Sequence, residues 1–223
     1  MPSSPTRPAV STVIPTYNGL DLLKKNLAKT VSILSDQDEL VIIDDASQDK
    51  TVGWLVKKYD LKGKSSLSQD DYKVYLKKSE TSFPQIKLIQ NKKNLRFAAS
   101  CNKAVKLANN KLIFLINNDV SPHDDVLNRL TPWFADETVF AVGCLELEPN
   151  RGGIKGGKNK LWFEKGMFVH ARADNFETGP TAWASGGSAM FNREKWLKLN
   201  GFDLAYYPAY WEDVDLSFRA KKQ

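Results

Sequence analysis

The sequence predicts an α/β protein in which a mostly parallel central sheet is flanked by helices. Apolar runs of strand length at residues 10–15, 40–43 and 112–116 alternate with segments of helical periodicity. This order of strands and helices favours right-handed crossovers and a parallel sheet. Each run also ends in turn-forming, acidic or amide residues, which places polar groups at the edge where open α/β sheets bind ligands.

Residues 112–116 (LIFLI) predict the central strand, because an unbroken apolar run suits a strand buried on both faces. Asn117, Asn118 and Asp119 follow at once, so two amides and a carboxylate stand at the carboxyl end of that strand. One interpretation is a ligand site. The other is a polar turn in which Asp119 caps a helix that begins near residues 122–124.

The first predicted helix follows the turn at Asn18 and Gly19. Its apolar residues recur at spacings of three and four and form one face that packs on the sheet; they are Leu20, Leu23, Leu27, Val31 and Leu34. The second strand, 40–43, leads into the acid-rich residues 44–49. Residues 51–59 then predict a short second helix.

Residues 61–84 are rich in lysine and serine with few large apolar side chains, so we expect a surface insertion with a solvated positive face. A third strand is expected at 86–89, and a helix rich in small residues at 94–108. The later part of the chain should be less regular, with four glycines in 150–157. Its expected elements are a helix at 125–134, strands at 139–147, 162–169 and within 181–191, a helix at 193–199 and a final helix opened by 211–215.

Length and composition fit one globular domain that spans residues 1–223, with 42% hydrophobic and 26% charged residues. No apolar run reaches roughly 18 residues and the N-terminus is polar, so we expect a cytoplasmic protein without a transmembrane segment. Cys101 and Cys144 lack metal-ligand spacing and are interpreted as buried thiols. The net charge of +6 comes from scattered basic residues without a nucleic-acid-binding motif, so nucleic acid is not an expected partner.

The order of short motifs along the chain is more specific than any one of them. These motifs are PTYN at 15–18, DDASQDKT at 44–51, NLRFAASCN at 94–102, NND at 117–119, SGG at 185–187, GFD at 201–203 and WEDVD at 211–215. Together, over residues 11–220, they resemble the family-2 glycosyltransferases. The resemblance implies the GT-A fold, a Rossmann-like mostly parallel sheet with a less regular acceptor-side half. NNDV and EDVDLSFR look most like bacterial rhamnosyltransferases and other enzymes of cell-surface polysaccharide synthesis.

The resemblance also implies how the domain is divided. The nucleotide-binding half should occupy residues 9–120 and the acceptor-side half residues 121–223. Relatives usually continue beyond the helix that carries WEDVD, so we expect the chain to be truncated at its C-terminus, without part of the acceptor site.

By the same resemblance, the donor nucleotide lies at the ends of the first strands. Pro15 and Tyr17 stand at the end of the first strand, where the tyrosine ring can stack on a nucleobase. Asp44 corresponds to the family acid that accepts a hydrogen bond from the N3–H group of uracil or thymine. Arg96, or its neighbour Lys93, is placed to meet the diphosphate, and either can equally be a solvated side chain.

Asn117, Asn118 and Asp119 correspond to the family's DXD metal motif, with asparagine in place of the first acid. Asp119 is therefore the expected ligand of Mn²⁺ or Mg²⁺, and Asn117 and Asn118 are expected at the donor. One carboxylate together with diphosphate oxygens can hold a hard divalent cation. The loss of one acid leaves strict metal dependence open.

Asp213 corresponds to the catalytic base that takes a proton from the acceptor hydroxyl. Glu212 would orient that base or the acceptor, and Asp215 is interpreted as structural. Acids in the first turn of a helix also have an ordinary role as caps and dipole partners, which is an equal alternative for this cluster. His170 has no chemical partner in the sequence and is interpreted as structural.

Ser185, Gly186 and Gly187 correspond to the segment that lines the donor sugar, where the missing side chains let the backbone come close. Trp183 and Trp211 have rings that can stack on sugar faces, and a core or rim position is an equal interpretation for each.

The function predicted from these residues is inverting transfer of a hexosyl group from a UDP- or dTDP-sugar to a hydroxyl of a glycan or lipid-linked acceptor. Synthesis of cell-envelope polysaccharide, with peripheral contact at the inner face of the plasma membrane, is the expected setting. A nucleotidyltransferase is one alternative, but it needs a glycine-rich basic loop where this chain has PTYNGLD. The other alternative is a nucleotide-sugar-binding module without activity.

Overall fold

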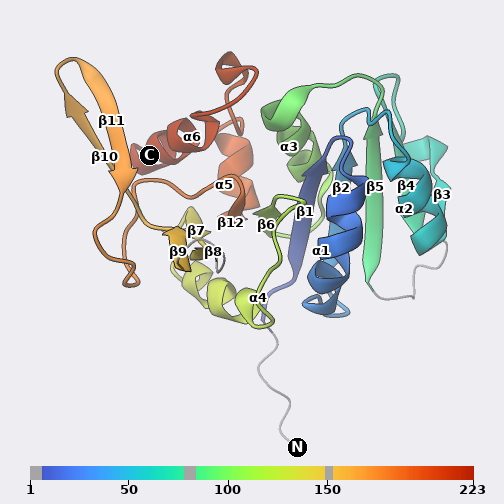
Figure 1. Ribbon diagram of the computed structural model, residues 1–223, viewed down its shortest axis with the longest axis horizontal. Coiled ribbons are helices and arrows are strands. Elements are labelled where there is room, and N and C mark those ends of the chain that lie inside the picture. The colour runs from blue at the N-terminus through green and yellow to red at the C-terminus, as the bar shows by residue number, and fades with distance from the viewer. Residues whose placement is uncertain (1–6, 78–83, 149–152) are drawn as a thin grey trace, which may run out of the picture.

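An eight-stranded sheet forms the centre of the protein and confirms the predicted α/β class (Figure 1). The computed structural model describes residues 7–77, 84–148 and 153–223. Within these residues, the strand order of the sheet is β3-β4-β5-β2-β1-β6-β12-β7. Its strands are β1 (Val10–Thr16), β2 (Glu39–Asp44), β3 (Leu61–Gly63), β4 (Tyr72–Lys77), β5 (Gln85–Asn91), β6 (Leu112–Ile116), β7 (Ala141–Gly143) and β12 (Ser188–Asn192).

Helices pack on both faces of this sheet. Leu27 of α1 and Leu55 of α2 belong to one apolar cluster. Ala104 of α3, Trp196 of α5 and Leu216 of α6 belong to the cluster on the other face. The helices are α1 (Leu20–Ser32), α2 (Thr51–Tyr59), α3 (Arg96–Leu107), α4 (Val126–Leu130), α5 (Arg193–Lys198) and α6 (Glu212–Lys221).

The four central strands, β5, β2, β1 and β6, are parallel, so their carboxyl ends meet at one edge. Every residue of β2 and β6 is buried, as expected for strands covered on both faces. At the edge, Thr16 pairs with Asp44, and Asp44 pairs with Gln90. The antiparallel strand β12 begins there, since Ser188 pairs with Ile116. Residues that follow β6 and residues that precede β12 therefore lie side by side.

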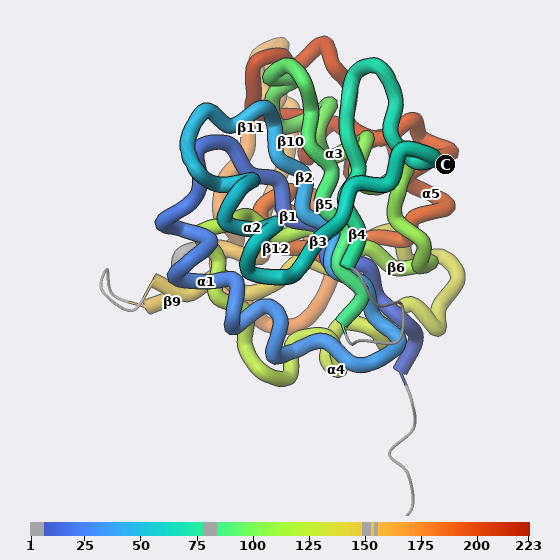
Figure 2. The backbone as a smooth tube through the Cα atoms, turned by 90° about the vertical axis from the view of Figure 1, so that its right-hand side faces the viewer, coloured from blue at the N-terminus to red at the C-terminus, as the bar shows by residue number. Residues whose placement is uncertain are grey.

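The segment 61–84 is not a surface insertion, and the prediction for it is wrong. Strands β3 and β4 extend the sheet antiparallel beyond β5, and Figure 2 views the molecule from that edge. Tyr72 and Val74 of β4 are buried, whereas Lys73 between them is exposed. This alternation is typical of a sheet with one covered face. The many lysines obscured it, and residues 78–83 of the segment lie outside the described residues.

Two predicted single strands are each divided. Residues 139–147 contain β7, which joins the main sheet, and the start of β8 (Glu146–Glu148), which pairs with β9 (Gly153–Gly156) in a separate sheet. Residues 162–169 span two arms of a hairpin, β10 (Asn159–Glu164) and β11 (Met167–Arg172). Lys165 and Gly166 have φ values of 50° and 83° and form its turn. A Lys-Gly pair lacks the usual Asn-Gly signal of such turns.

The helix predicted at 125–134 is instead α4 followed by a 3-10 helix, η2 (Thr131–Ala135), with Pro132 in its first turn. A proline cannot continue an α-helical hydrogen-bond ladder, which explains the change. Of the glycine-rich stretch 150–157, residues 150–152 lie outside the described residues, and the remainder includes β9.

Candidate active site

Asn118 ties the end of β6 to the end of β1. Its Nδ2 donates to Thr16 Oγ1 at 2.9 Å, and its backbone carbonyl accepts from Asn26 Nδ2 at 3.1 Å. Gly19 makes room for this contact, since a Cβ at position 19 would lie 2.3 Å from both Asn118 Nδ2 and Thr16 Oγ1. The predicted donor-binding residue Asn118 therefore also holds two strand ends together.

Asn117 meets the glycine segment that precedes β12. Its backbone N–H donates to the carbonyl of Gly187 at 2.9 Å. A Cβ on Gly187 would lie 3.0 Å from Asn117 Nδ2, so only a residue without a side chain fits closely here. Ser185 Oγ in turn accepts from the Gly187 N–H at 3.2 Å. The structure thus brings together the NND and SGG residues that the sequence placed 66 or more positions apart.

Asp213 is bonded to the same glycine segment. Its Oδ2 accepts from the Gly186 N–H at 3.0 Å, and its Oδ1 accepts from the Val214 N–H at 2.8 Å. Burial raises the pKa of Asp213 above that of an exposed aspartate, although these backbone hydrogen bonds partly oppose the shift. Trp211, not Asp213, occupies the N-cap position of α6. The carboxylate therefore faces the glycine segment from the first turn of the helix.

Glu212 is buried and holds the turn that leads into α6. Its Oε2 accepts from the Tyr210 N–H at 2.9 Å, and Tyr210 and Trp211 both have positive φ values, 91° and 78°. Burial raises the pKa of Glu212. The pKa of Cys101 in α3 is raised mainly by burial and further by the charge of Glu212. Glu212 thus supports the backbone that leads into Asp213, and the orienting role predicted for it stays a prediction.

Asp215 pairs with another part of α6. Its Oδ2 accepts from Arg219 Nε at 2.7 Å, and Arg219 also donates to the carbonyls of Leu199 and Gly201. This ion pair anchors the last helix to the end of α5, as expected of a structural residue.

A cavity of about 750 Å³ opens beside Tyr17, which is 44% exposed and follows the half-buried Pro15 of β1. Ser47, Gln90, Lys73 and Lys93 are among the residues that line it. The cavity has the dimensions of a small-ligand site, and the exposed ring can cover a flat group such as a nucleobase.

Asp44 does not line this cavity, because its side chain is fully buried. Its Oδ1 accepts from the Ser47 N–H at 3.1 Å, and its Oδ2 is buried without a hydrogen-bond partner among the described residues. Burial raises the pKa of Asp44. Because Asp44 is fully buried, a ligand could reach Oδ2 only after a local rearrangement of the residues that cover it.

The neighbouring acid, Asp45, sets the start of α3 and was missed by the sequence reasoning. Its two oxygens accept from the N–H groups of Leu95 and Arg96 at 2.8 Å, and Oδ1 also accepts from Asn91 Nδ2. Arg96 has a φ of 68° at this point. A hydrogen bond with Tyr207 raises the pKa of the Arg96 guanidinium. Arg96 therefore connects α3 with the loop before α6. The paired acids of the DD motif were the available signal for Asp45.

Asp119 is exposed, and it does not cap a helix. α4 begins at Val126 with Asp125 in the N-cap position, which excludes the capping interpretation. No cluster of three or more potential metal-binding side chains occurs among the described residues. The donor set here is one carboxylate, on Asp119, and the amide of Asn117. These hard oxygen donors fit Mn²⁺ or Mg²⁺ when diphosphate oxygens and water complete the coordination.

His170 has aromatic partners that its sequence position did not reveal. Its ring lies edge-on to Trp183 at 5.5 Å and to Trp211 at 5.0 Å between centroids. Phe168 of the same strand lies 5.3 Å from Phe218 of α6. The hairpin of β10 and β11 is thereby packed against the helix that carries Asp213 (Figure 1).

Comparison with known proteins gives a family and a fold. The family model described as glycosyl transferase family 2 matches residues 11–198. None of the curated proteins compared with the chain matches it. Three solved structures are similar to this chain. Their sequence identities are 14–20%, so they support the fold alone.

The mannosyltransferase PcManGT from Pyrobaculum calidifontis, in complex with GDP-Man and Mn²⁺, is 20% identical with a TM-score of 0.65, covering 97% of this chain and 52% of its own. S. aureus TarS 1–349 is 16% identical with a TM-score of 0.64, and the match covers 95% of this chain and 55% of the TarS chain. GalNAc-T7 with UDP, GalNAc and Mn²⁺ is 14% identical with a TM-score of 0.71, and the match covers 97% of this chain and 41% of the GalNAc-T7 chain. The chain thus spans about half the length of these structures.

Replacing Gly19 with alanine should destabilise the protein by about 1–3 kcal/mol, because the new Cβ would overpack the contact between Asn118 and Thr16. Gly53→Ala is the matched control. Gly53 lies on an exposed face of α2 with no atom near the position of a new Cβ, so this change should stabilise the helix by about 0.5–1 kcal/mol. Urea unfolding of both variants measures the difference. Equal stabilities would show that position 19 has room for a side chain.

Proposed function

Since residues 11–198 match its model, this chain belongs to glycosyl transferase family 2, and we propose that it transfers a sugar from a nucleoside diphosphate donor to an acceptor hydroxyl. The reaction inverts the configuration at the anomeric carbon. The donor is a UDP- or dTDP-hexose, and the acceptor is a hydroxyl of a glycan or of a lipid-linked saccharide.

The observation that carries this proposal is the position of Asp213. The Gly186 N–H donates to its Oδ2 at 3.0 Å and holds the half-buried carboxylate at the end of the sheet where the NND and SGG residues meet. Each carboxylate oxygen keeps a lone pair beyond the one used by the backbone. A raised pKa makes Asp213 a stronger base than an exposed aspartate.

In the proposed reaction, Asp213 accepts the proton of the acceptor hydroxyl while the hydroxyl oxygen attacks the anomeric carbon. Attack comes from the face opposite the diphosphate. The bond between the anomeric carbon and the diphosphate oxygen breaks, and its electron pair leaves with the nucleoside diphosphate. Arg96 and Lys93 lie beyond the ends of β2 and β5, where their charges would attract that anion.

Asp119, with the amide oxygen of Asn117, would hold a divalent cation at the diphosphate. When bound, Mn²⁺ or Mg²⁺ supplies positive charge that favours departure of the diphosphate. Two of the similar structures contain Mn²⁺, which supports the choice of metal.

The preference for uracil or thymine as the nucleobase of the donor is proposed from Asp44 and Tyr17. Tyr17 would stack on the nucleobase, and Asp44 Oδ2 would accept from its N3–H after a local rearrangement that exposes this oxygen. The similar structures include GDP-Man, UDP and UDP-GlcNAc complexes, so they do not choose between bases.

A lipid-linked acceptor and a place in cell-surface polysaccharide synthesis, of the rhamnosyltransferase type, complete the proposal. Its support is the hairpin beside α6, which exposes Trp162, Phe163, Met167 and Phe168 by 40–67%. No helix among the described residues is long and apolar enough to cross a membrane. Contact with the inner face of the plasma membrane would therefore be peripheral.

Titration with UDP, dTDP, GDP and ADP should give the tightest binding for UDP or dTDP. Asp44→Ala should remove that preference, which corresponds to one charge-assisted hydrogen bond and about ten- to a hundredfold in affinity. Equal affinities for UDP and ADP in the unchanged protein would contradict the proposed base selection.

Incubation with UDP- and dTDP-sugars then separates the possible activities. Hydrolysis or transfer of the sugar supports the transferase. Binding without turnover would point to a nucleotide-sugar-binding module. Formation of a nucleotide sugar from a sugar phosphate and a nucleoside triphosphate would identify a nucleotidyltransferase.

Asp213→Asn should lower the transfer rate about 10²- to 10⁴-fold while nucleotide binding stays unchanged, because asparagine keeps the shape but cannot accept the proton. The amide can accept only one of the two backbone hydrogen bonds, so a modest loss of stability should accompany the change. In the unchanged protein, kcat/KM should fall with decreasing pH as Asp213 becomes protonated. This fall should begin at a higher pH than an exposed aspartate would give. Asp215→Asn is the control, and it should lose stability but retain turnover. Transfer by Asp213→Asn at more than about a tenth of the normal rate would exclude Asp213 as the base.

Diphosphate binding should tighten with Mn²⁺ or Mg²⁺, and Asp119→Ala should abolish most of that gain. Asn117→Ala should matter less, because an amide oxygen is a weaker ligand than a carboxylate. Calorimetric titration with UDP in the presence of MnCl₂ or EDTA measures the effect. Identical dissociation constants in the two buffers would rule out a metal at this site.

A further inference from the structure

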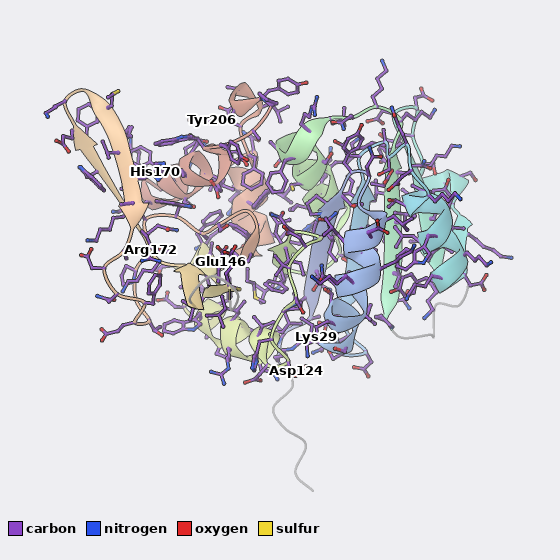
Figure 3. All side chains as sticks on the ribbon, in the orientation of Figure 1. Lys29, Asp124, Glu146, His170, Arg172 and Tyr206 are labelled. Atoms are coloured by element: carbon purple, nitrogen blue, oxygen red, sulfur yellow. The ribbon has the colours of Figure 1, made fainter. Side chains whose placement is uncertain are left out.

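Glu146, the first residue of β8, is a second carboxylate beside the glycine segment. Its Oε1 accepts from Ser188 Oγ at 2.7 Å, and Ser188 directly follows the SGG residues. The backbone of Ser188 also pairs with this strand region, since its carbonyl accepts from the Cys144 N–H at 3.0 Å. Figure 3 shows Glu146 toward the middle of the molecule, whereas His170 and Arg172 lie farther out on the hairpin.

The other oxygen of Glu146, Oε2, takes no part in the contact with Ser188. No hydrogen bond to Oε2 occurs within the described part of the chain, and the side chain is half-buried. On one side, Oε2 faces Gly156 of β9, where a Cβ would lie 3.0 Å away. The missing side chain at position 156 leaves the carboxylate room.

Glu146 and Asp213 are bonded to the two ends of one short segment. Asp213 accepts from the Gly186 N–H, and Glu146 accepts from Ser188 Oγ, with Gly187 between them. The charge of Glu146 contributes to the raised pKa of Asp213, after the larger effect of burial. The two carboxylates are thus close enough to repel each other.

A purely structural role does not explain a charge at this position. A neutral amide oxygen would accept the same hydrogen bond from Ser188 without repelling Asp213. A carboxylate is an acceptor only, and Oε2 can accept from a ligand in place of water. No cluster suited to a metal ion is found among the described residues. Hydroxyl groups are the donors that a sugar brings to such a site.

We propose that Glu146 binds a hydroxyl group of the donor sugar through Oε2 and is a specificity-determining residue for that sugar. This inference rests on the proposed function, because it requires a nucleotide sugar to lie beside the half-buried Gly187. The bond between Oε1 and Ser188 holds the carboxylate in place before the sugar arrives.

The test compares binding of UDP with binding of four sugar nucleotides, UDP-glucose, UDP-N-acetylglucosamine, dTDP-rhamnose and GDP-mannose. Calorimetry first identifies the sugar nucleotide that the unchanged protein binds best. Glu146→Gln should weaken binding of that ligand about ten- to a hundredfold, the effect of one charge-assisted hydrogen bond. Binding of UDP should not change, because UDP carries no sugar beyond its diphosphate. Glu146→Gln keeps an amide oxygen for Ser188, so its melting temperature should stay near that of the unchanged protein.

Glu137→Gln is the matched control, since it removes the same charge from an exposed position before β7. This position lies near the start of β6, at the end of the sheet away from Glu146. The control variant should change neither affinity. The pH dependence of turnover checks the repulsion between the two carboxylates. Removing the charge of Glu146 should move the acid limb of kcat/KM to lower pH, whether or not Glu146 contacts the sugar, so the affinities alone test the inference.

The outcomes distinguish this inference from the function on which it rests. If the unchanged protein binds none of the nucleotides or sugar nucleotides, the proposed function fails and the inference falls with it. The inference alone is overturned if sugar nucleotides bind but Glu146→Gln weakens their binding and the binding of UDP equally, or changes neither affinity. The same holds if the sugar nucleotides bind no more tightly than UDP.

Discussion

The hydrogen bond from the Gly186 N–H to Asp213 joins the last helix to the edge of the sheet, and the geometry of the site depends on it. A buried backbone N–H needs a partner, and a carboxylate is a strong one. The same segment meets Asn117 through the carbonyl of Gly187 and Glu146 through the hydroxyl of Ser188. One short stretch without bulky side chains therefore sets the relative positions of three residues of the candidate site, which come from β8, α6 and the end of β6.

The pairing of β6 with β12 makes this convergence possible. Ser188 opposes Ile116, so the chain leaving β6 and the chain entering β12 turn past each other at one edge. A slip of one residue would point every side chain of β12 to the other face. Met190 and Phe191 are buried in opposite apolar clusters, which opposes such a slip. Core packing thus holds the register that places Asn117 beside Gly187.

Three acids near this edge have different environments, which is why different roles are proposed for them. Glu212 is directed toward α3 and supports a backbone turn with two positive φ values. Asp213 faces the glycine segment, and Glu146 stands at its far end. Burial raises the pKa values of Glu212 and Asp213, and the charge of Glu146 raises that of Asp213 further. Burial and like charge both favour the protonated acid, which suits a group that must accept a proton during a reaction.

The sequence by itself determined the fold class and most of the helices and strands, because periodicity and turn chemistry are local. The roles of Asp119, Gly186 and Asp213 came from motifs that resemble a family, and they are proposals. Only the tertiary structure decided which distant groups meet. Glu146 bonds Ser188, which is 42 residues away, and Asp45 bonds the Arg96 backbone, which is 51 residues away. Only the fold showed that Asp44 is fully buried, that β4 is a strand of the sheet and that His170 contacts two tryptophans. Such contacts follow from strand order and register, and a local pattern does not contain that information.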